Sequence, residues 1–221
     1  MFSYILFDLD GTISDPKVGI TGSVQYALHA LGINEPDVDR LEPFIGPPLR
    51  DSFQEYYHLN KEQTELAVQK YRERFLAKGI YENVLYPGMR ELLKRLKASG
   101  CHLAVASSKL EVSVTEILRY FALEDFFEVT VGSEPDGTRS SKEDVVEEAL
   151  HRFFPEGRIP YDDIVMIGDR KFDVIGGKKF GLHQIAVSYG YAPEGELEAA
   201  GAEYIADSVE ELGSILFTGK K

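Results

Sequence analysis

The sequence has little cysteine, no tryptophan and no long apolar run, and each lack narrows the class of protein. Cys101 is the one cysteine among 221 residues, so no internal disulfide can form, which fits a reducing compartment. No apolar stretch approaches the ~20 residues that a membrane helix needs. The short apolar stretch at the start has no basic leader and ends at an acid, which indicates a strand rather than a signal peptide. We therefore expect a cytoplasmic protein that has no membrane partner.

Positive charge is also scarce. The chain has 24 Lys and Arg residues against 37 Asp and Glu residues, a formal net charge of −13 at pH 7. Such a charge repels polyanions at long range, so we expect no nucleic acid polymer as a partner. A small phosphorylated metabolite is compatible with this charge if its site carries local cations. Whether the protein is a monomer or a homodimer stays open at this stage.

The order of strand and helix patterns predicts an α/β fold with an insertion. Residues 2–7 read as a buried strand, and from residue 80 onward strand patterns alternate with helical ones. Such alternation builds a doubly wound parallel sheet with helices on both faces. The block from about 17 to 79 is helical throughout and does not fit this alternation. We therefore expect a catalytic core at 1–15 and 80–221 and an inserted all-helical cap domain at 16–79.

Polar side chains gather where predicted strands end or the following helices begin. In doubly wound sheets the ligand lies beyond the carboxyl ends of the strands, so these segments are candidates for one shared site. A Ser140–Glu143 pair reads as a capping box that opens the helix carrying Lys142. The segments are Asp8-Leu9-Asp10-Gly11-Thr12, Ser107-Ser108-Lys109, Lys142 and Gly168-Asp169-Arg170-Lys171-Phe172-Asp173.

Carboxylates are the dominant feature of these segments. Asp8 and Asp10 flank one turn, while Asp169 and Asp173 follow another strand. Two like charges 4 Å apart cost about 4 kcal/mol at an effective dielectric constant near 20. Such a cluster requires a divalent cation or raised pKa values. An oxygen-only ligand set suits Mg²⁺, which binds through one or two carboxylates together with a phosphate.

The four segments in this order resemble the four motifs of the haloacid dehalogenase superfamily, in its phosphatase branch. The resemblance spans essentially the whole chain, including the helical cap after the first motif. Three further stretches resemble a subgroup described as 5′-nucleotidases, which is also often labelled phosphoglycolate phosphatase. They are Ile45-Gly46-Pro47-Pro48-Leu49-Arg50-Asp51-Ser52-Phe53, Asp136-Gly137-Thr138-Arg139 and Gly168-Asp169-Arg170-Lys171.

This resemblance implies a function and a role for each residue. The expected enzyme is a Mg²⁺-dependent phosphomonoesterase that hydrolyses a 5′-nucleotide or a phosphoglycolate-like ester through an aspartyl-phosphate on Asp8. Asp10 would be the general acid and then the base. Mg²⁺ would bind Asp8, the main-chain carbonyl of Asp10 and Asp169, with Asp173 bound through water or orienting the other ligands. The residues implied in holding the phosphoryl group are Gly11, Thr12, Ser107, Ser108 and Lys142.

Several alternatives stay open. Arg50 is a candidate for the leaving group's anionic part, or a solvated helix residue that pairs with a neighbour. Ser108 and Phe172 depart from the residues that the resemblance leads us to expect, Asn and His. A sugar phosphomutase and a non-catalytic phospho-ligand binding protein are the competing functions. Taken singly, the acids are also compatible with a polar turn or helix caps, and Lys142 with a solvated lysine.

Overall fold

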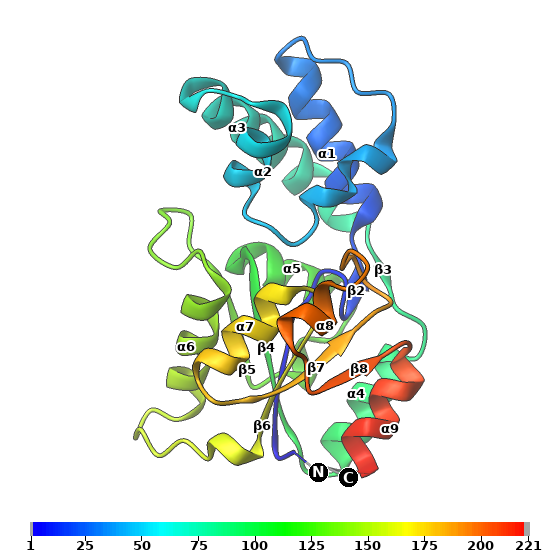
Figure 1. Cartoon of the computed structure of the whole chain (residues 1–221), viewed down its shortest axis with the longest axis vertical. Helices are drawn as coiled ribbons and strands as arrows, with labels where there is room; N and C mark the ends of the chain where they lie inside the picture. The colour runs from blue at the N-terminus through cyan, green and yellow to red at the C-terminus, as the bar shows by residue number, and fades with distance from the viewer. Residues whose placement is uncertain (1, 219–221) are drawn as a thin grey trace. The chain divides into compact units, whose positions relative to one another are not determined.

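The computed structural model describes residues 2–218, and the chain divides into two compact units (Figure 1). One unit consists of Met1–Asp15 and Leu85–Lys221 and contains the main sheet. The other consists of Pro16–Val84 and is largely helical. Two short strands, β2 (Ser14–Asp15) and β3 (Val84–Leu85), lie where the chain passes from one unit to the other, and they pair in a two-stranded sheet.

Across residues 2–218, six strands form one sheet in the order β5-β4-β1-β6-β7-β8, and all neighbours are parallel. The two central strands consist almost entirely of apolar residues, as is usual for strands covered on both faces of a sheet. This confirms the predicted doubly wound α/β fold. The strands are β1 (Tyr4–Phe7), β4 (His102–Leu110), β5 (Val129–Ser133), β6 (Ile164–Gly168), β7 (His183–Val187) and β8 (Tyr204–Ala206).

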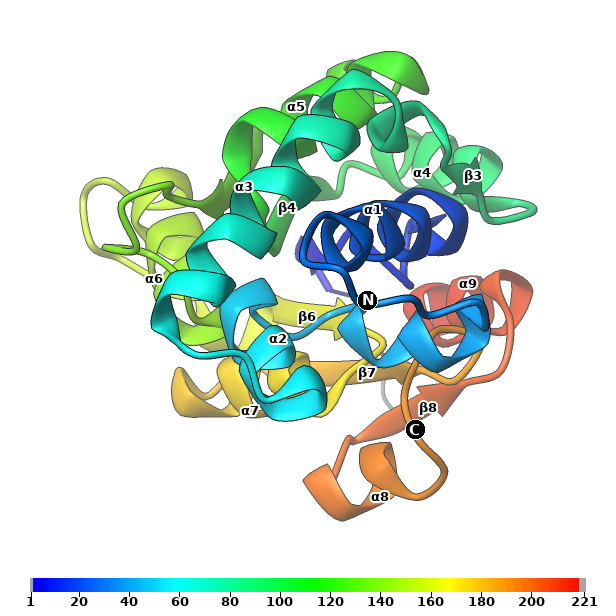
Figure 2. The same cartoon turned by 90° about the horizontal axis from the view of Figure 1, so that it is seen from above.

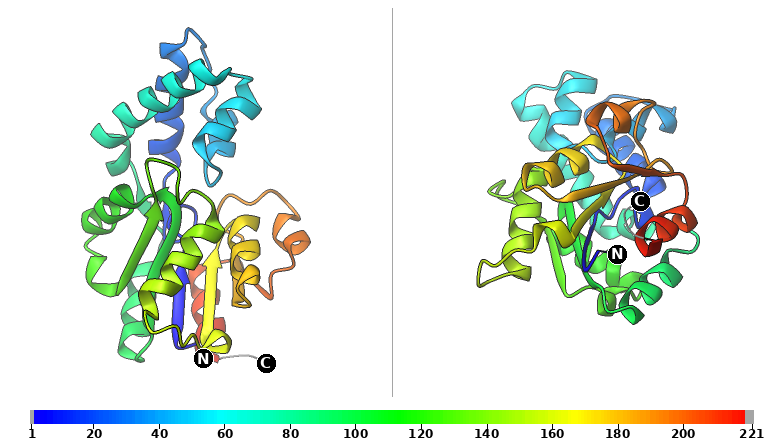
Figure 3. Two further views of the ribbon diagram at one scale, coloured as in Figure 1. Left: turned by 90° about the vertical axis from the view of Figure 1, so that its left-hand side faces the viewer. Right: turned by 60° about the horizontal axis from the view of Figure 1, so that its bottom comes forward.

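Helices cover both faces of this sheet. Figure 3 shows α4 and α5 on one face and α6 and α7 on the other. Val146 and Leu150 of α6 pack with Leu6 and Met166 in one buried apolar cluster. The sequence patterns did not predict the short α8 or the edge strand β8. The helices of this unit are α4 (Met89–Ala98), α5 (Glu111–Tyr120), α6 (Lys142–Phe153), α7 (Lys171–Lys179), α8 (Glu196–Ala200) and α9 (Val209–Thr218), with 3₁₀ turns η3 (Glu124–Phe126) and η4 (Tyr161–Asp163).

The helical unit is built around α1 and α3, which pack side by side (Figure 2). Gly19 of α1 allows the turn that follows α3 to approach closely, because a Cβ there would lie 2.1 Å from the carbonyl oxygen of Gly79. This unit extends beyond residue 79 to Val84, since Glu82 accepts a hydrogen bond from the Gly19 amide and pairs with Arg74. Its elements are α1 (Lys17–Ala30), η1 (Val38–Phe44), α2 (Leu49–Tyr57), α3 (Lys61–Ala77) and η2 (Gly79–Tyr81).

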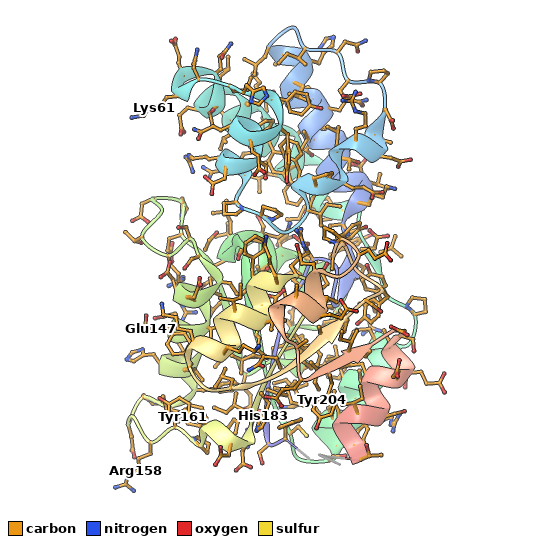
Figure 4. The ribbon with its side chains drawn as sticks, viewed as in Figure 1. Lys61, Glu147, Arg158, Tyr161, His183 and Tyr204 are labelled. Atoms are coloured by element: carbon orange, nitrogen blue, oxygen red, sulfur yellow. The ribbon has the colours of Figure 1, made fainter. Side chains whose placement is uncertain are left out.

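Charged side chains lie mainly on the surface of each unit. Figure 4 shows Lys61, Glu147 and Arg158 pointing away from the ribbon, and all three are exposed. Among residues 2–218, no helix combines the length and the apolar character needed to cross a membrane. A small group of charged residues departs from this pattern, because it is buried at the carboxyl ends of the central strands.

Candidate active site

The parallel register brings the ends of β1, β4 and β6 together. Phe7 lies opposite Val105 on β4 and opposite Ile167 on β6, so the next residues of all three strands emerge at one edge of the sheet. Asp8 follows β1 directly, and its amide donates to the Ile167 carbonyl over 2.8 Å. Asp169 follows β6. The sheet topology alone therefore places the two carboxylates beside each other.

Three carboxylates converge at this edge. Oxygens of Asp8, Asp169 and Asp173 all lie within 4.8 Å of one another, and the three residues are buried. Asp173 reaches the group from the first turn of α7, where its Oδ2 accepts a hydrogen bond of 3.0 Å from the Arg170 amide. Gly11 is required beside them, because a Cβ at this residue would lie 2.1 Å from Oδ2 of Asp169. The structure thus brings together three of the four predicted acids.

Lys142 is the cation of this cluster. Its Nζ lies 2.9 Å from Asp8 Oδ1 and 2.8 Å from Asp173 Oδ1, and it donates to the Ala106 carbonyl over 2.9 Å. Burial lowers the pKa of Lys142, but Asp173 and Asp8 outweigh burial and raise it above the ordinary value. The ammonium group is therefore charged at neutral pH and neutralises one of the three carboxylates.

The capping box of the helix that carries Lys142 lies one residue later than the sequence pattern predicts. The capping box pairs Ser141 with Asp144 rather than Ser140 with Glu143. The Ser141 hydroxyl accepts from the Asp144 amide over 3.1 Å, and Asp144 accepts from the Ser141 amide over 3.0 Å. Aspartate can close the box as glutamate does, so the pattern was correct in kind and wrong in register. Lys142 is the first helical residue, as predicted.

The charge balance of the cluster fits a divalent cation. With all three carboxylates ionised, the cluster and the Lys142 ammonium group would together carry two negative charges. Burial raises the pKa of Asp173 to about 6, with Lys142 opposing the shift and Asp8 adding to it. Burial, Asp173 and Asp8 together raise the pKa of Asp169 well above its ordinary value. Among the described residues, Oδ1 of Asp169 is buried without a hydrogen-bond partner. A buried carboxylate oxygen without a donor is suited to bind a cation.

Asp10 is placed differently from the other acids. Its Oδ2 lies 2.6 Å from Nζ of Lys109, and both side chains are about nine-tenths buried. Burial raises the pKa of Asp10, Lys109 opposes this, and Asp8 adds a smaller rise. Lys109, the last residue of the Ser107-Ser108-Lys109 segment that the sequence patterns assigned to the shared site, is thus the direct partner of Asp10.

The residues predicted to hold phosphate, apart from Lys142, lie in β4 and in the turn after β1. Ser107 is buried within β4, where its Oγ accepts from the Lys109 amide over 3.4 Å, and Ser108 follows it. The amides of Gly11 and Thr12 donate to carbonyls of their own turn, those of Ser14 and Leu9. These two residues therefore shape the turn, and a role for them or for the serines in holding phosphate stays a prediction.

Arg50 lies in the helical unit. Its guanidinium group makes a two-pronged pair with Glu65, with distances of 2.7 Å from Nε to Oε1 and 3.0 Å from Nη2 to Oε2. Both side chains are substantially exposed. This arrangement agrees with the alternative of a solvated helix residue that pairs with a neighbour, and a role in substrate recognition stays a prediction.

The sequence reasoning missed the loop after β7. The Tyr191 amide donates to Oδ2 of Asp169 over 2.7 Å, and the Tyr189 hydroxyl donates to the Thr12 carbonyl over 3.0 Å. Between them, Gly190 lies so close that a Cβ would be 2.4 Å from Cβ of Asp169 and 2.5 Å from the Gly11 carbonyl oxygen. A glycine between two tyrosines directly after a buried strand was the available signal for a close backbone approach.

Gly190→Ala is expected to displace Asp169 and so to lower the affinity for Mg²⁺ by about 10- to 100-fold, a typical cost of disturbing the support of a metal ligand. The measurement is a Mg²⁺ titration followed by isothermal calorimetry. Gly213→Ala in α9 is the control, since its Cβ would lie 3.2 Å from a terminal methyl group of Leu92 rather than against the carboxylate cluster. Equal affinities in Gly190→Ala and the control would contradict this role of the loop.

Comparison with known proteins agrees with this geometry. The family model described as haloacid dehalogenase-like hydrolase matches residues 5–187. A 5′-nucleotidase of Pseudomonas aeruginosa strain PAO1 is 47% identical over 195 residues, which are 88% of this chain and 86% of that protein. The tyrosine-protein kinase PtkA of Mycobacterium tuberculosis is 38% identical over 187 residues, 85% of this chain and 62% of that protein.

A solved structure extends the likeness to the whole fold. The crystal structure of a predicted phosphatase from Clostridium acetobutylicum superposes with a TM-score of 0.92 and 45% identity, covering 99% of this chain and 100% of that chain. The family match spans the segments that carry Asp8, Ser107, Lys142 and Asp169. The resemblance that the four motifs indicate is thus confirmed, and the chain belongs to the haloacid dehalogenase-like hydrolases, as an enzyme of their phosphatase branch.

Proposed function

We propose that this chain is a Mg²⁺-dependent phosphomonoesterase in which Asp8 accepts the phosphoryl group of a small phosphate ester. The observation that carries the proposal is the buried cluster of Asp8, Asp169 and Asp173 at one strand edge, with Lys142 between two of its members. The Asp10–Lys109 pair lies beside it, two residues from Asp8. A nucleophile, a candidate acid–base residue and fixed positive charge are the parts that phosphoryl transfer needs.

In the proposed first step, an oxygen of Asp8 attacks phosphorus and the bond from phosphorus to the ester oxygen breaks. A carboxylate is a weak base and is already ionised at neutral pH, so it requires no neighbouring base to act as nucleophile. Asp10 gives a proton to the departing alkoxide and then takes one from the water that hydrolyses the aspartyl-phosphate. Lys142 holds Asp8 in place and neutralises charge on the transferred group.

The residues that would hold Mg²⁺ are Asp8, Asp169 and Asp173 together with the main-chain carbonyl of Asp10. When bound, the cation withdraws charge from the phosphoryl oxygens and offsets the repulsion among the carboxylates. The chemistry of this donor set fits the ion, because all ligands are oxygens and carboxylates lead them.

Mg²⁺ is expected to stabilise the protein more at pH 7.5 than at pH 5. The folded-state pKa of Asp173 is about 6, above its ordinary value, so the metal-free fold binds protons more tightly than the unfolded chain. Its stability therefore falls as pH rises from about 4 through 6, and the cation relieves this loss. At about 100 times the dissociation constant, the melting temperature at pH 7.5 should rise by about 5–10 °C.

The check is a thermal melt with Mg²⁺ or EDTA at each pH, with Asp169→Asn as the variant that should lose the Mg²⁺ effect. A rise in melting temperature that is equal at both pH values, or unchanged in Asp169→Asn, would contradict the assigned cation site.

A small phosphorylated metabolite is the proposed substrate, and a nucleoside 5′-monophosphate is favoured because a 5′-nucleotidase is among the similar proteins. We further propose that the helical unit, at 16–79 by the sequence patterns and Pro16–Val84 in the structure, is the cap that selects the leaving group. The direct test measures phosphate release from para-nitrophenyl phosphate, nucleoside monophosphates, phosphoglycolate and sugar phosphates, with Mg²⁺ and with EDTA. No release from any ester in Mg²⁺ would overturn the proposal. An isomer without free phosphate would indicate a mutase instead.

A further inference from the structure

The segment that carries Ser107 and Lys109 is a bulge in β4. Ala106 pairs with Val131 on β5, and the next pair joins Leu110 to Ser133, the last residues of the two strands. From one pair to the next the chain advances four residues along β4 and two along β5, so β4 carries two extra residues. Extra residues bend the strand and redirect its side chains. This bulge is how Lys109 leaves the line of the strand and reaches Asp10.

The far end of the bulge is fixed by Glu111, the first residue of α5. Its Oε2 accepts hydrogen bonds from the Gly132 amide over 3.2 Å and from Arg139 Nη2 over 2.8 Å. Arg152 of α6 adds contacts of 3.1 Å to both carboxylate oxygens. Gly132 must be a glycine here, since a Cβ would lie 2.4 Å from Cα of Glu111 and 2.6 Å from the Lys109 carbonyl oxygen.

Arg139 joins this point to the loop that leads into α6. Its Nε donates to the Gly132 carbonyl over 2.7 Å, and its Nη2 also contacts Glu134 at 2.7 Å. The side chain is 14% exposed, although the loop around it is largely exposed. Arg139 also belongs to the Asp136-Gly137-Thr138-Arg139 stretch, which the catalytic chemistry above does not use. An arginine with this many acceptors holds β5, α5 and the loop in one arrangement.

We propose that Arg139 and Glu111 form a clamp that fixes the bulge of β4, and that both are positioning residues acting on Asp10 through Lys109. The inference rests on the proposed function, since it assigns the clamp to the acid–base step of that reaction. Removing the clamp frees the far end of the bulge, so Lys109 no longer holds the Asp10 carboxylate in one place. Displacement of a catalytic group by about 1 Å costs on the order of 100-fold in rate.

The test is a double-mutant cycle on kcat and KM for para-nitrophenyl phosphate. Arg139→Ala is expected to lower kcat by about 10- to 100-fold with little change in KM, since neither clamp residue holds the substrate. In a Lys109→Ala background, Arg139→Ala should lower kcat by less than about threefold, because the contact through which the clamp acts on Asp10 is already absent. Arg119→Ala is the matched control, as Arg119 lies on α5 in an exposed pair with Glu116.

Hydrogen exchange of the amides at 107–111 gives a readout that is independent of turnover. It should accelerate in Arg139→Ala and not in Arg119→Ala, and the milder Glu111→Gln serves if Arg139→Ala does not fold. A clamp that only stabilises the fold would lower the melting temperature and leave kcat unchanged below it, which would overturn the proposal. An equal loss of kcat on Arg139→Ala in the wild-type and Lys109→Ala backgrounds would overturn it as well. If the wild type hydrolyses nothing, the proposed function fails, and unchanged exchange at 107–111 would then overturn the clamp separately.

Discussion

Asp8→Asn is expected to lower turnover by at least about 10³-fold, because it replaces the atom that bonds to phosphorus. The fold should survive the change. Lys142 keeps its contacts with Asp173 and the Ala106 carbonyl, at 2.8 and 2.9 Å. Losing one of three converging carboxylates also reduces their mutual repulsion. We therefore expect a melting temperature close to that of the wild type, or slightly above it, in metal-free buffer.

The measurement compares kcat and thermal melting of the purified variant with those of the wild type. Asp162→Asn is the matched control, since Asp162 is an exposed residue of η4. Mass spectrometry of the sample excludes deamidation of the new asparagine back to aspartate. Hydrolysis within tenfold of the wild-type rate in the intact variant would contradict the role of Asp8 as nucleophile.

Lys142→Met is expected to have the largest effect on stability. The substitution keeps most of the side-chain length and removes the charge from between Asp8 and Asp173. Removing one partner of a buried pair costs about 3–5 kcal/mol, because the other charge stays buried without compensation. Hydrolysis should be lost too, since the ammonium group both positions Asp8 and neutralises the transferred phosphoryl group.

The free energy of unfolding of Lys142→Met should recover in part as pH falls. Lys142 opposes the rise in the pKa of Asp173, which is about 6 in the wild type, so its removal raises this pKa further. Protonation of the carboxylates at pH 5 then removes much of the uncompensated charge. Urea unfolding at pH 5 and 7.5 measures this, with Lys94→Met as control, because Lys94 forms an exposed pair with Glu91. If Lys142→Met lowers the free energy of unfolding at pH 7.5 no more than Lys94→Met does, the account of Lys142 is refuted.

The strand-end positions of the candidate site were predictable from local patterns. Asp8, Ser107 and Asp169 each follow an apolar run, and a parallel sheet brings such ends to one edge. Lys142 was predictable as the opening of a helix, although its capping residues were assigned one position too early. These features depend on short stretches of sequence and on one topological rule, which is why the fold class and the cluster could be inferred together.

Other contacts depend on register and on distant segments, which local patterns do not encode. The pairing of Lys109 with Asp10 follows from two extra residues in β4, and this offset is visible only against β5. The loop at Tyr191 reaches Asp169 across 22 positions of sequence. The pKa of Asp10 is governed by burial, a property of the assembled site rather than of its neighbours in the chain.

The central claim is that Asp8 becomes phosphorylated during turnover, and trapping the intermediate tests it most directly. Asp10→Asn should slow hydrolysis of the aspartyl-phosphate, because it removes the proposed base. The substrate is para-nitrophenyl phosphate, whose phenolate leaves without help from an acid, so the intermediate should form and accumulate when this ester and Mg²⁺ are added. Rapid quenching and reduction with borohydride convert an aspartyl-phosphate into homoserine, which mass spectrometry locates in the chain. The account predicts homoserine at position 8 in samples with substrate and none in samples without it. Turnover by the wild type with unmodified aspartate at position 8 in every quenched sample, or with the modification at another acid, would contradict it.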